Sequence, residues 1–182
     1  MGARAVFLVG FMGAGKNTVG HELARRLGWD FVDLDEQIER REAQTIPEIF
    51  RTKGESAFRL AETDALREFL ANSHRRNSVV ALGGGAFVEQ KNRALLREWP
   101  TVFLDVPVDE LWQRCQQDGA GRPLRRDRDE FSSLHAQRLP FYREATLTVE
   151  TGGKELLSIC LEIEHALRLT RSLENLRGGE SQ

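Results

Sequence analysis

Short apolar runs alternate with longer amphipathic segments along almost the whole chain. The apolar runs predict five strands, at residues 5–9, 30–33, 79–82, 101–105 and 146–149. The amphipathic segments predict helices at residues 16–27, 36–42, 46–52, 55–72, 91–98, 108–117, 130–142 and 154–169. Strands that alternate with helices indicate an α/β fold, in which a mainly parallel sheet is covered by helices on both faces.

Polar and glycine-rich segments follow the first three predicted strands. They are a loop at residues 10–16, the acidic pair Asp33 and Asp35, and three successive glycines at residues 83–85. Three glycines in a row permit close backbone approach to a ligand. Because ligands of parallel sheets bind beyond the carboxyl ends of the strands, we expect these segments to form one site.

The loop after the first strand is of the kind that binds nucleoside triphosphates. Gly10, Gly15 and Lys16 follow the spacing Gly-x-x-x-x-Gly-Lys between a predicted strand and a predicted helix. The glycines let backbone N–H groups face phosphate oxygens, and the helix presents its positive end to them. Lys16 is expected to reach the β- and γ-phosphates. An ordinary strand–turn–helix is the competing interpretation.

The residue after Lys16 departs from this motif. The position normally offers a Ser or Thr hydroxyl to Mg²⁺, whereas this chain has Asn17, with Thr18 one place later. An amide oxygen can bind Mg²⁺, but the Asn side chain is longer and cannot lose a proton. We therefore expect weakened Mg²⁺ binding unless the loop shifts or Thr18 compensates.

Asp33 and Asp35 are candidates for the chemistry. Residues two apart in an extended segment project to the same side, so both carboxylates are expected to face one cleft. One carboxylate could support a metal-bound water, and the other could accept the proton of an acceptor hydroxyl. Alternatively, either aspartate caps the helix that is predicted to begin near Glu36.

Two arginines are candidates for binding an anionic substrate. Arg59, on a predicted helix, could bind a carboxylate through two hydrogen bonds. Taken alone, Arg59 fits a surface or salt-bridged arginine better than a ligand-binding one, since Glu55, Glu62 and Glu68 are within reach. Arg138 lies near a helix end, where an arginine commonly complements the helix dipole.

Residues 119–129 lack any hydrophobic period and contain two glycines, a proline and four arginines. We predict a mobile lid over about residues 118–130, because phosphoryl transfer requires arginine and the exclusion of water. The alternative is a solvated connector whose charges have no role.

Composition narrows the class of protein. The chain has 182 residues and a net charge of −2, which suits a single domain at residues 1–172 with a polar tail at 173–182. This balance favours neither nucleic acid nor a membrane as partner. Cys115 and Cys160 match no metal-binding spacing, so we expect reduced thiols on helices of a cytoplasmic protein. The first apolar run is too short to span a membrane and leads directly into the loop, so we do not expect it to be a signal peptide.

These motifs together resemble the shikimate kinase family. The matching segments extend over about residues 5–165 and are GFMGAGKNT, DLDEQI, FR at 58–59, GGG at 83–85, RPL at 122–124 and QRLPFYRE at 137–144. The resemblance implies a three-layer P-loop kinase fold with a five-stranded parallel sheet. It also implies Mg²⁺-dependent transfer of the γ-phosphate of ATP to the 3-hydroxyl of shikimate, in aromatic amino-acid biosynthesis, by a monomer.

The resemblance also assigns roles by matched position. It implies that the ATP phosphates are held by Gly10, Gly13, Ala14, Gly15, Lys16, Asn17 and Thr18. Asp35 would orient or deprotonate the reacting hydroxyl, and Asp33 would support the metal together with Asn17. The shikimate carboxylate and ring would be bound by Arg59, Arg138, Gly83, Gly84 and Gly85. Arg122, in the lid, would close over the phosphates as a catalytic residue.

The adenine side departs from the family pattern. The family often places an arginine in the loop after the last strand, where this chain has Thr151-Gly-Gly-Lys154. Lys154 is expected to take part of that role, although a lysine stacks less well than an arginine. Arg114 is a weaker candidate for the same position.

Two other functions compete with this interpretation. A different small-molecule kinase, such as a gluconate kinase, would share the fold, but the arginines and the three glycines favour an acidic ring-shaped substrate. A nucleotide-binding pseudo-kinase would explain Asn17 and would bind ATP or ADP without turnover. A GTPase is disfavoured because the chain has no Asn-Lys-x-Asp motif.

Overall fold

Strand β1 lies at the centre of a five-stranded parallel sheet. The computed structural model describes residues 5–72, 76–117 and 127–170. The strands are β1 (Ala5–Val9), β2 (Asp30–Asp33), β3 (Ser78–Ala81), β4 (Thr101–Asp105) and β5 (Leu147–Glu150). Their order in the sheet is β2-β3-β1-β4-β5, and every neighbouring pair is parallel. This confirms the predicted α/β class and sheet.

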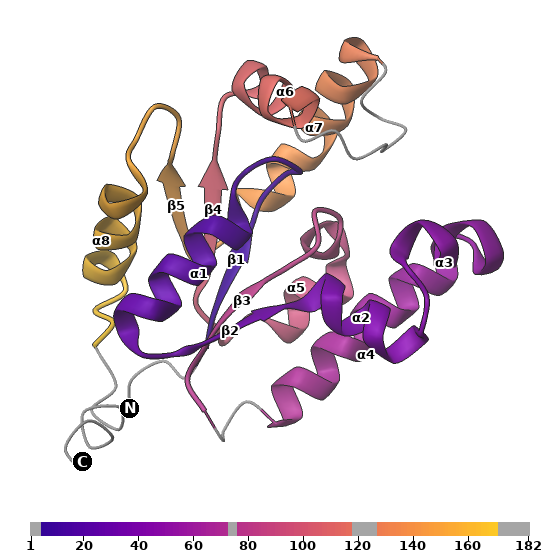
Figure 1. The fold of residues 1–182 in the computed structure, drawn as a ribbon, viewed down its shortest axis with the longest axis horizontal. Coiled ribbons are helices and arrows are strands. Elements are labelled where there is room, and N and C mark those ends of the chain that lie inside the picture. The colour runs from indigo at the N-terminus through magenta and orange to yellow at the C-terminus, as the bar shows by residue number, and fades with distance from the viewer. Residues whose placement is uncertain (1–4, 73–75, 118–126, 171–182) are drawn as a thin grey trace, which may run out of the picture.

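Helices cover both faces of this sheet (Figure 1). They are α1 (Lys16–Leu27), α2 (Leu34–Glu42), α3 (Ile46–Lys53), α4 (Glu55–Asn72), the 3₁₀ turn η1 (Ala86–Val88), α5 (Gln90–Leu95), α6 (Val108–Gln117), α7 (Arg128–Tyr142) and α8 (Leu156–Ala166). None of the helices in the described ranges is long and apolar enough to cross a lipid bilayer.

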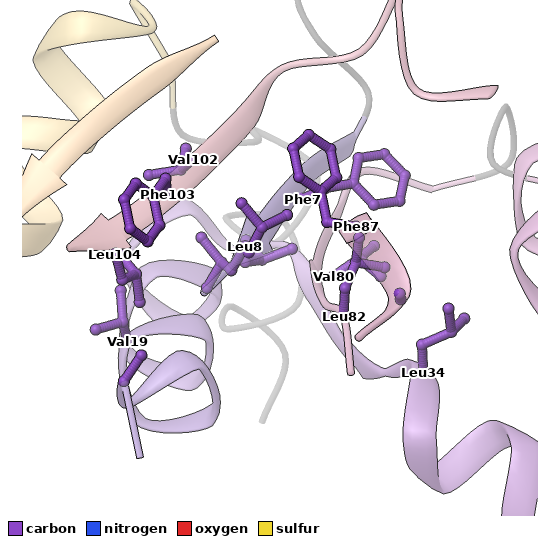
Figure 2. Close-up of a cluster of buried hydrophobic side chains, with 14 of the residues drawn as sticks. Phe7, Leu8, Val19, Leu34, Val80, Leu82, Phe87, Val102, Phe103 and Leu104 are labelled. Carbon is purple, nitrogen blue, oxygen red and sulfur yellow. The ribbon is translucent and has the colours of Figure 1, made fainter. Parts of the chain in front are cut away.

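The three layers follow from the alternation of side chains along β1. Phe7 packs edge-on against Phe69 of α4 and against Trp99. A methyl carbon of the next residue, Leu8, approaches Gly20 of α1 instead. Successive strand residues point to opposite faces, so α4 and α1 cover opposite sides of the sheet. Figure 2 shows the buried side chains around these two residues.

The strand order places the candidate site at the carboxyl end of β1. After β1 the chain forms β2, and β3 then lies between β2 and β1 in the sheet. Strand β4 follows on the other side of β1. The direction of the chain thus reverses beside β1, which opens a crevice at that end of an α/β sheet. Figure 1 shows α6 beyond the carboxyl end of β4, above this region.

Most of the predicted elements are correct, and the differences lie at their ends. Helix α2 begins at Leu34 rather than at residue 36, because Asp33 caps it. Helix α5 is shorter than predicted, and the preceding turn η1 was missed. The capping box of α3, formed by Thr45 and Glu48, is present. Cys115 and Cys160 are buried thiols on α6 and α8, as predicted.

The predicted lid at residues 118–130 overlaps the start of α7. The Asp127 side chain accepts hydrogen bonds from the N–H groups of Asp129 and Glu130, so residues 128–130 are helical. Helix α7 thus begins at Arg128, two residues before the predicted helix start at residue 130. Residues 118–126, which include Arg122, and the predicted tail at 173–182 lie outside the described residues.

We expect Phe7→Ala to lower the free energy of unfolding by about 3–5 kcal/mol, because it leaves a cavity against two aromatic rings. Phe7 is fully buried, whereas Leu60 on α4 is 55% exposed. Leu60→Ala is the control and should change stability by less than about 0.5 kcal/mol. Urea unfolding of both variants measures the difference, and equal effects would contradict the central position of Phe7.

Candidate functional site

The glycine-rich loop after β1 depends on backbone conformations that favour glycine. Gly10, Gly13 and Gly15 all have positive φ angles, of 150°, 79° and 85°. A Cβ atom on Gly13 would lie 2.9 Å from Sγ of Cys115, so the loop also rests directly on α6. The loop leads into α1, whose first N–H groups form a natural site for phosphate.

Lys16 lies folded over this loop. Its ammonium group donates hydrogen bonds to the carbonyl oxygens of Gly10 at 2.9 Å and Phe11 at 3.0 Å. The charge is therefore held above the loop, where a phosphate group would bind. The expected contact of Lys16 with the β- and γ-phosphates stays a prediction.

A cavity of about 730 Å³ opens over the loop. It joins most of the predicted nucleotide side to the acidic residues and two of the three glycines. The candidate residues from the sequence that line this cavity are Gly13, Ala14, Gly15, Lys16, Asn17, Thr18, Asp33, Asp35, Gly83, Gly84, Arg114 and Lys154. Gly10, Gly85, Arg59 and Arg138 do not line it.

Asp33 and Asp35 reach this cavity by a route that differs from the prediction. Asp33 ends β2, and its Oδ1 accepts the N–H groups of Asp35 at 2.9 Å and Glu36 at 3.4 Å. Asp35 therefore lies in the first turn of α2, and the predicted extended geometry of the pair is wrong. The cap brings both side chains to the cavity nevertheless, and the proposed capping role belongs to Asp33.

The glycines after β3 leave room for side chains from three other elements. A Cβ on Gly83 would lie 2.5 Å from Oδ1 of Asp35, and a Cβ on Gly85 would lie 2.5 Å from Nη1 of Arg59. Nη1 of Arg138 would be 3.8 Å from a Cβ on Gly84. These residues from α2, α4 and α7 are thus brought together around residues 83–85, next to the cavity.

Arg59 is held in place by two carboxylates. Its guanidinium donates to Glu62 at 2.5 Å and to Glu55 at 3.3 Å, whereas the third predicted partner, Glu68, pairs with Arg41. The Arg59 side chain is only 16% exposed. The ion pairs that the sequence offered as an alternative therefore exist, and they hold Arg59 against Gly85.

Glu62 is the main feature that sequence reasoning undervalued. Its side chain is 1% exposed, and its Oε1 finds no hydrogen-bond partner among the described residues. Burial raises the pKa of Glu62 to about 7, opposed by Arg59 and reinforced by Asp35 and Glu89. The spacing to Arg59 was visible in the sequence, but it did not distinguish Glu62 from exposed glutamates on the same helix.

Tyr142 is a second residue that the sequence did not single out. Its hydroxyl donates a hydrogen bond to the carbonyl oxygen of Gly84, and its ring stacks on Phe103 at 5.3 Å. Burial raises the pKa of Tyr142 to about 12, so the phenol keeps its proton at neutral pH. Tyr142 thereby ties the end of α7 to the three glycines.

Arg114 and Lys154, the two candidates for the adenine side, differ in their contacts with the glycine-rich loop. Arg114 donates to the carbonyl oxygen of Gly13 at 3.3 Å and to Glu110 at 2.5 Å. Lys154 forms an ion pair with Glu162 at 2.7 Å instead. Both line the cavity, but only Arg114 makes a described contact with the phosphate loop, so it is the stronger candidate of the two.

The residues near the loop are compatible with Mg²⁺. The candidate donors are carboxylate and amide oxygens of Asp33 and Asn17, which suit this hard cation. Mg²⁺ commonly uses one or two carboxylates together with substrate phosphates and water. The described residues contain no cluster of three or more His, Cys, Asp or Glu that could enclose an ion. Asn17 at present donates its amide to Asp33 at 2.6 Å.

Comparison with known proteins gives one consistent result. A family model described as shikimate kinase matches residues 12–168. A shikimate kinase of Persephonella marina is 40% identical over 91% of this chain and 99% of its own length. The structure of a shikimate kinase from Acinetobacter baumannii in complex with shikimate is 38% identical, has a TM-score of 0.82, and covers 91% of this chain and 94% of that chain. A deoxyadenosine kinase from M. mycoides, 13% identical with a TM-score of 0.63 over 90% of this chain and 98% of its own, shares the fold.

We expect Glu62→Gln to change how stability depends on pH. The folded-state pKa of about 7 lies above the ordinary value of 4.5, so the protonated carboxyl favours the folded state below pH 4.5, and this advantage is lost as the pH rises to 7. The native protein should therefore lose up to about 3 kcal/mol of unfolding free energy relative to Glu62→Gln between these values. Urea unfolding at several pH values measures it. Glu68→Gln, on the same helix, should retain the native pH dependence, and a constant difference between native protein and Glu62→Gln would contradict the assignment.

Proposed function

Because the chain belongs to the shikimate kinase family, we propose that its cavity binds ATP over the phosphate loop and shikimate beside Gly83, Gly84 and Gly85. The protein is an ATP-dependent kinase that transfers the γ-phosphate of ATP to the 3-hydroxyl of shikimate. The main support for this assignment is that Lys16 and Asp35 line the same cavity.

The phosphate loop and α1 bind the triphosphate of ATP. Backbone N–H groups of the loop and the positive end of α1 face the phosphate oxygens. Lys16 exchanges its hydrogen bonds to Gly10 and Phe11 for phosphate oxygens, because a charged acceptor binds an ammonium group more strongly than a carbonyl does. Arg114 adds a second positive charge beside Gly13.

Asp33 and Asn17 are the residues that would hold Mg²⁺, which supplies neutralisation of phosphate charge when bound. Phosphoryl transfer depends mainly on positioning and on electrostatic stabilisation, so the residues that orient the two substrates carry most of the catalysis. Arg122 lies outside the described residues, and its role at the phosphates stays a prediction from the family.

Asp35 accepts the proton of the reacting hydroxyl group. The 3-hydroxyl oxygen of shikimate forms a bond to the γ-phosphorus, and the bond from this phosphorus to the β–γ bridging oxygen breaks to release ADP. The hydroxyl proton passes to the Asp35 carboxylate, which the first turn of α2 holds against Gly83. The lack of a side chain at Gly83 gives the shikimate ring access to this carboxylate.

Arg59 and Arg138 bind the shikimate carboxylate. Both guanidinium groups lie beside the three glycines, and each can offer two parallel N–H donors to a carboxylate. Glu62 and Glu55 fix Arg59, while Arg138 lies over the ring of Phe11 at 5.7 Å. This arrangement favours an acidic ring over the open chain of gluconate.

We also propose that the protein acts as a monomer in the cytoplasm. The thiols of Cys115 and Cys160 are buried on different helices, as suits a reducing compartment.

Shikimate-dependent release of ADP from Mg·ATP tests the function. The native protein should release ADP with shikimate and release none with gluconate or without an acceptor. Asp35→Asn should lower kcat about 10²- to 10⁴-fold, because it removes the proton acceptor, and should leave the KM for ATP within about threefold. Bound ADP without any turnover would indicate a pseudo-kinase, and near-native kcat in Asp35→Asn would contradict the role of this carboxylate.

Two arginine variants should separate the two substrate sites. Arg138→Met should raise the KM for shikimate by roughly 10- to 100-fold, because it removes charged hydrogen bonds to a carboxylate, and should leave the KM for ATP nearly unchanged. Arg114→Met, a matched truncation, should raise the KM for ATP and spare that for shikimate. Steady-state kinetics measure both constants, and a rise in the same KM for both variants would overturn the assignment.

A further inference from the structure

Asn17 and Asp33 join two elements that border the cavity. Asn17 lies in the first turn of α1, and Asp33 ends β2. The amide nitrogen Nδ2 of Asn17 donates to Oδ2 of Asp33 at 2.6 Å, and the ionised acceptor makes this a charge-assisted hydrogen bond. An amide that faces a carboxylate must present its NH₂ group, since two oxygens would repel each other, so the orientation of Asn17 is defined.

The same carboxylate also supports α2 through its second oxygen. Oδ1 of Asp33 caps α2 by accepting the N–H groups of Asp35 and Glu36. Asp33 therefore links the start of α1 to the turn that carries Asp35. A serine at position 17 has a shorter side chain, with one hydroxyl in place of the amide.

We propose that the Asn17–Asp33 hydrogen bond is a metal-independent clasp that fixes the start of α2 to the phosphate loop. The clasp places an amide donor on the carboxylate oxygen that would also face a metal ion. Because this oxygen has two lone pairs, Asp33 can keep the hydrogen bond and still support Mg²⁺, but the amide draws electron density from it, so the ion adds less to nucleotide affinity than it does with a hydroxyl at position 17. Asn17 acts here as a positioning residue, through Asp33.

Asn17 is exposed, and three observations distinguish its hydrogen bond from the other exposed side-chain hydrogen bonds. Asn17 and Asp33 line the same cavity as Lys16 and Asp35. Both oxygens of Asp33 are engaged, one to each neighbouring element. The link bridges residues that are 16 positions apart in the chain. The clasp itself is argued from geometry alone. Its effect on Mg²⁺ binding rests on the proposed function, in which the protein uses a metal–nucleotide substrate.

Hydrogen exchange of the Asp35 and Glu36 amides tests the clasp without nucleotide or metal. Asn17→Ser should speed their exchange on the order of tenfold, because the carboxylate that accepts them is no longer held by the amide. Arg25→Gln is the matched control, since it removes another side-chain hydrogen bond of α1, to Glu22. Unchanged exchange in Asn17→Ser, or equal acceleration in Arg25→Gln, would overturn the proposal.

Calorimetric titration with ADP tests the consequence for the metal. The ratio of the Kd in EDTA to the Kd in excess Mg²⁺ should be about tenfold larger for Asn17→Ser than for the native protein. Asn17→Thr gives a second variant with a hydroxyl, should Asn17→Ser prove unstable. Equal ratios would overturn the proposed effect on Mg²⁺. Neither hydrogen exchange nor ADP titration depends on turnover. If the native protein bound ADP but did not phosphorylate shikimate, the kinase assignment would therefore be contradicted and the clasp would not.

Discussion

The position of β1 between β3 and β4 is the constraint on which the rest of the structure depends. Because the strand order reverses beside β1, the loops after the neighbouring strands diverge and leave a crevice at its carboxyl end. The phosphate loop occupies this crevice directly, and residues 83–85 follow β3 beside it. Burial on both faces holds β1 in place, since Phe7 and Leu8 pack against helices on opposite sides.

The two halves of the site are built by different means. The proposed nucleotide side depends on the backbone, because three glycines of the loop have positive φ angles, a geometry that forms anion-binding concavities in other proteins. The acceptor side uses side chains from three helices, which converge only because residues 83–85 carry none of their own. Glu62 and Tyr142 then fix this proposed acceptor side, Glu62 through its ion pair with Arg59 and Tyr142 through its hydrogen bond to the Gly84 carbonyl oxygen.

The sequence predicted the features that depend on local pattern and missed those that depend on burial. The phosphate loop and the α/β class were predictable because glycine spacing and hydrophobic period are local. The geometry of Asp33 and Asp35 was predicted wrongly, since the Asp33 cap makes the following residues helical where an extended segment was expected. Glu62 shares its helix and residue type with exposed glutamates, and only the fold shows that it is buried. The contact of Arg114 with Gly13 joins residues 101 positions apart, beyond the range of any sequence pattern.

The contact between Gly13 and Cys115 gives α6 a part in the shape of the phosphate loop. The sulfur atom lies directly beneath the loop, where no room remains for an additional atom on Gly13. The neighbouring residue on α6, Arg114, contacts the same glycine through its carbonyl oxygen. The floor of the nucleotide site is thus a helix surface whose side-chain volume is matched to the loop. Gly13 is therefore constrained twice, by its positive φ and by the sulfur atom next to it, and the loop in turn limits how large residue 115 can be. A residue that contacts no substrate thus shares in determining the shape of the loop.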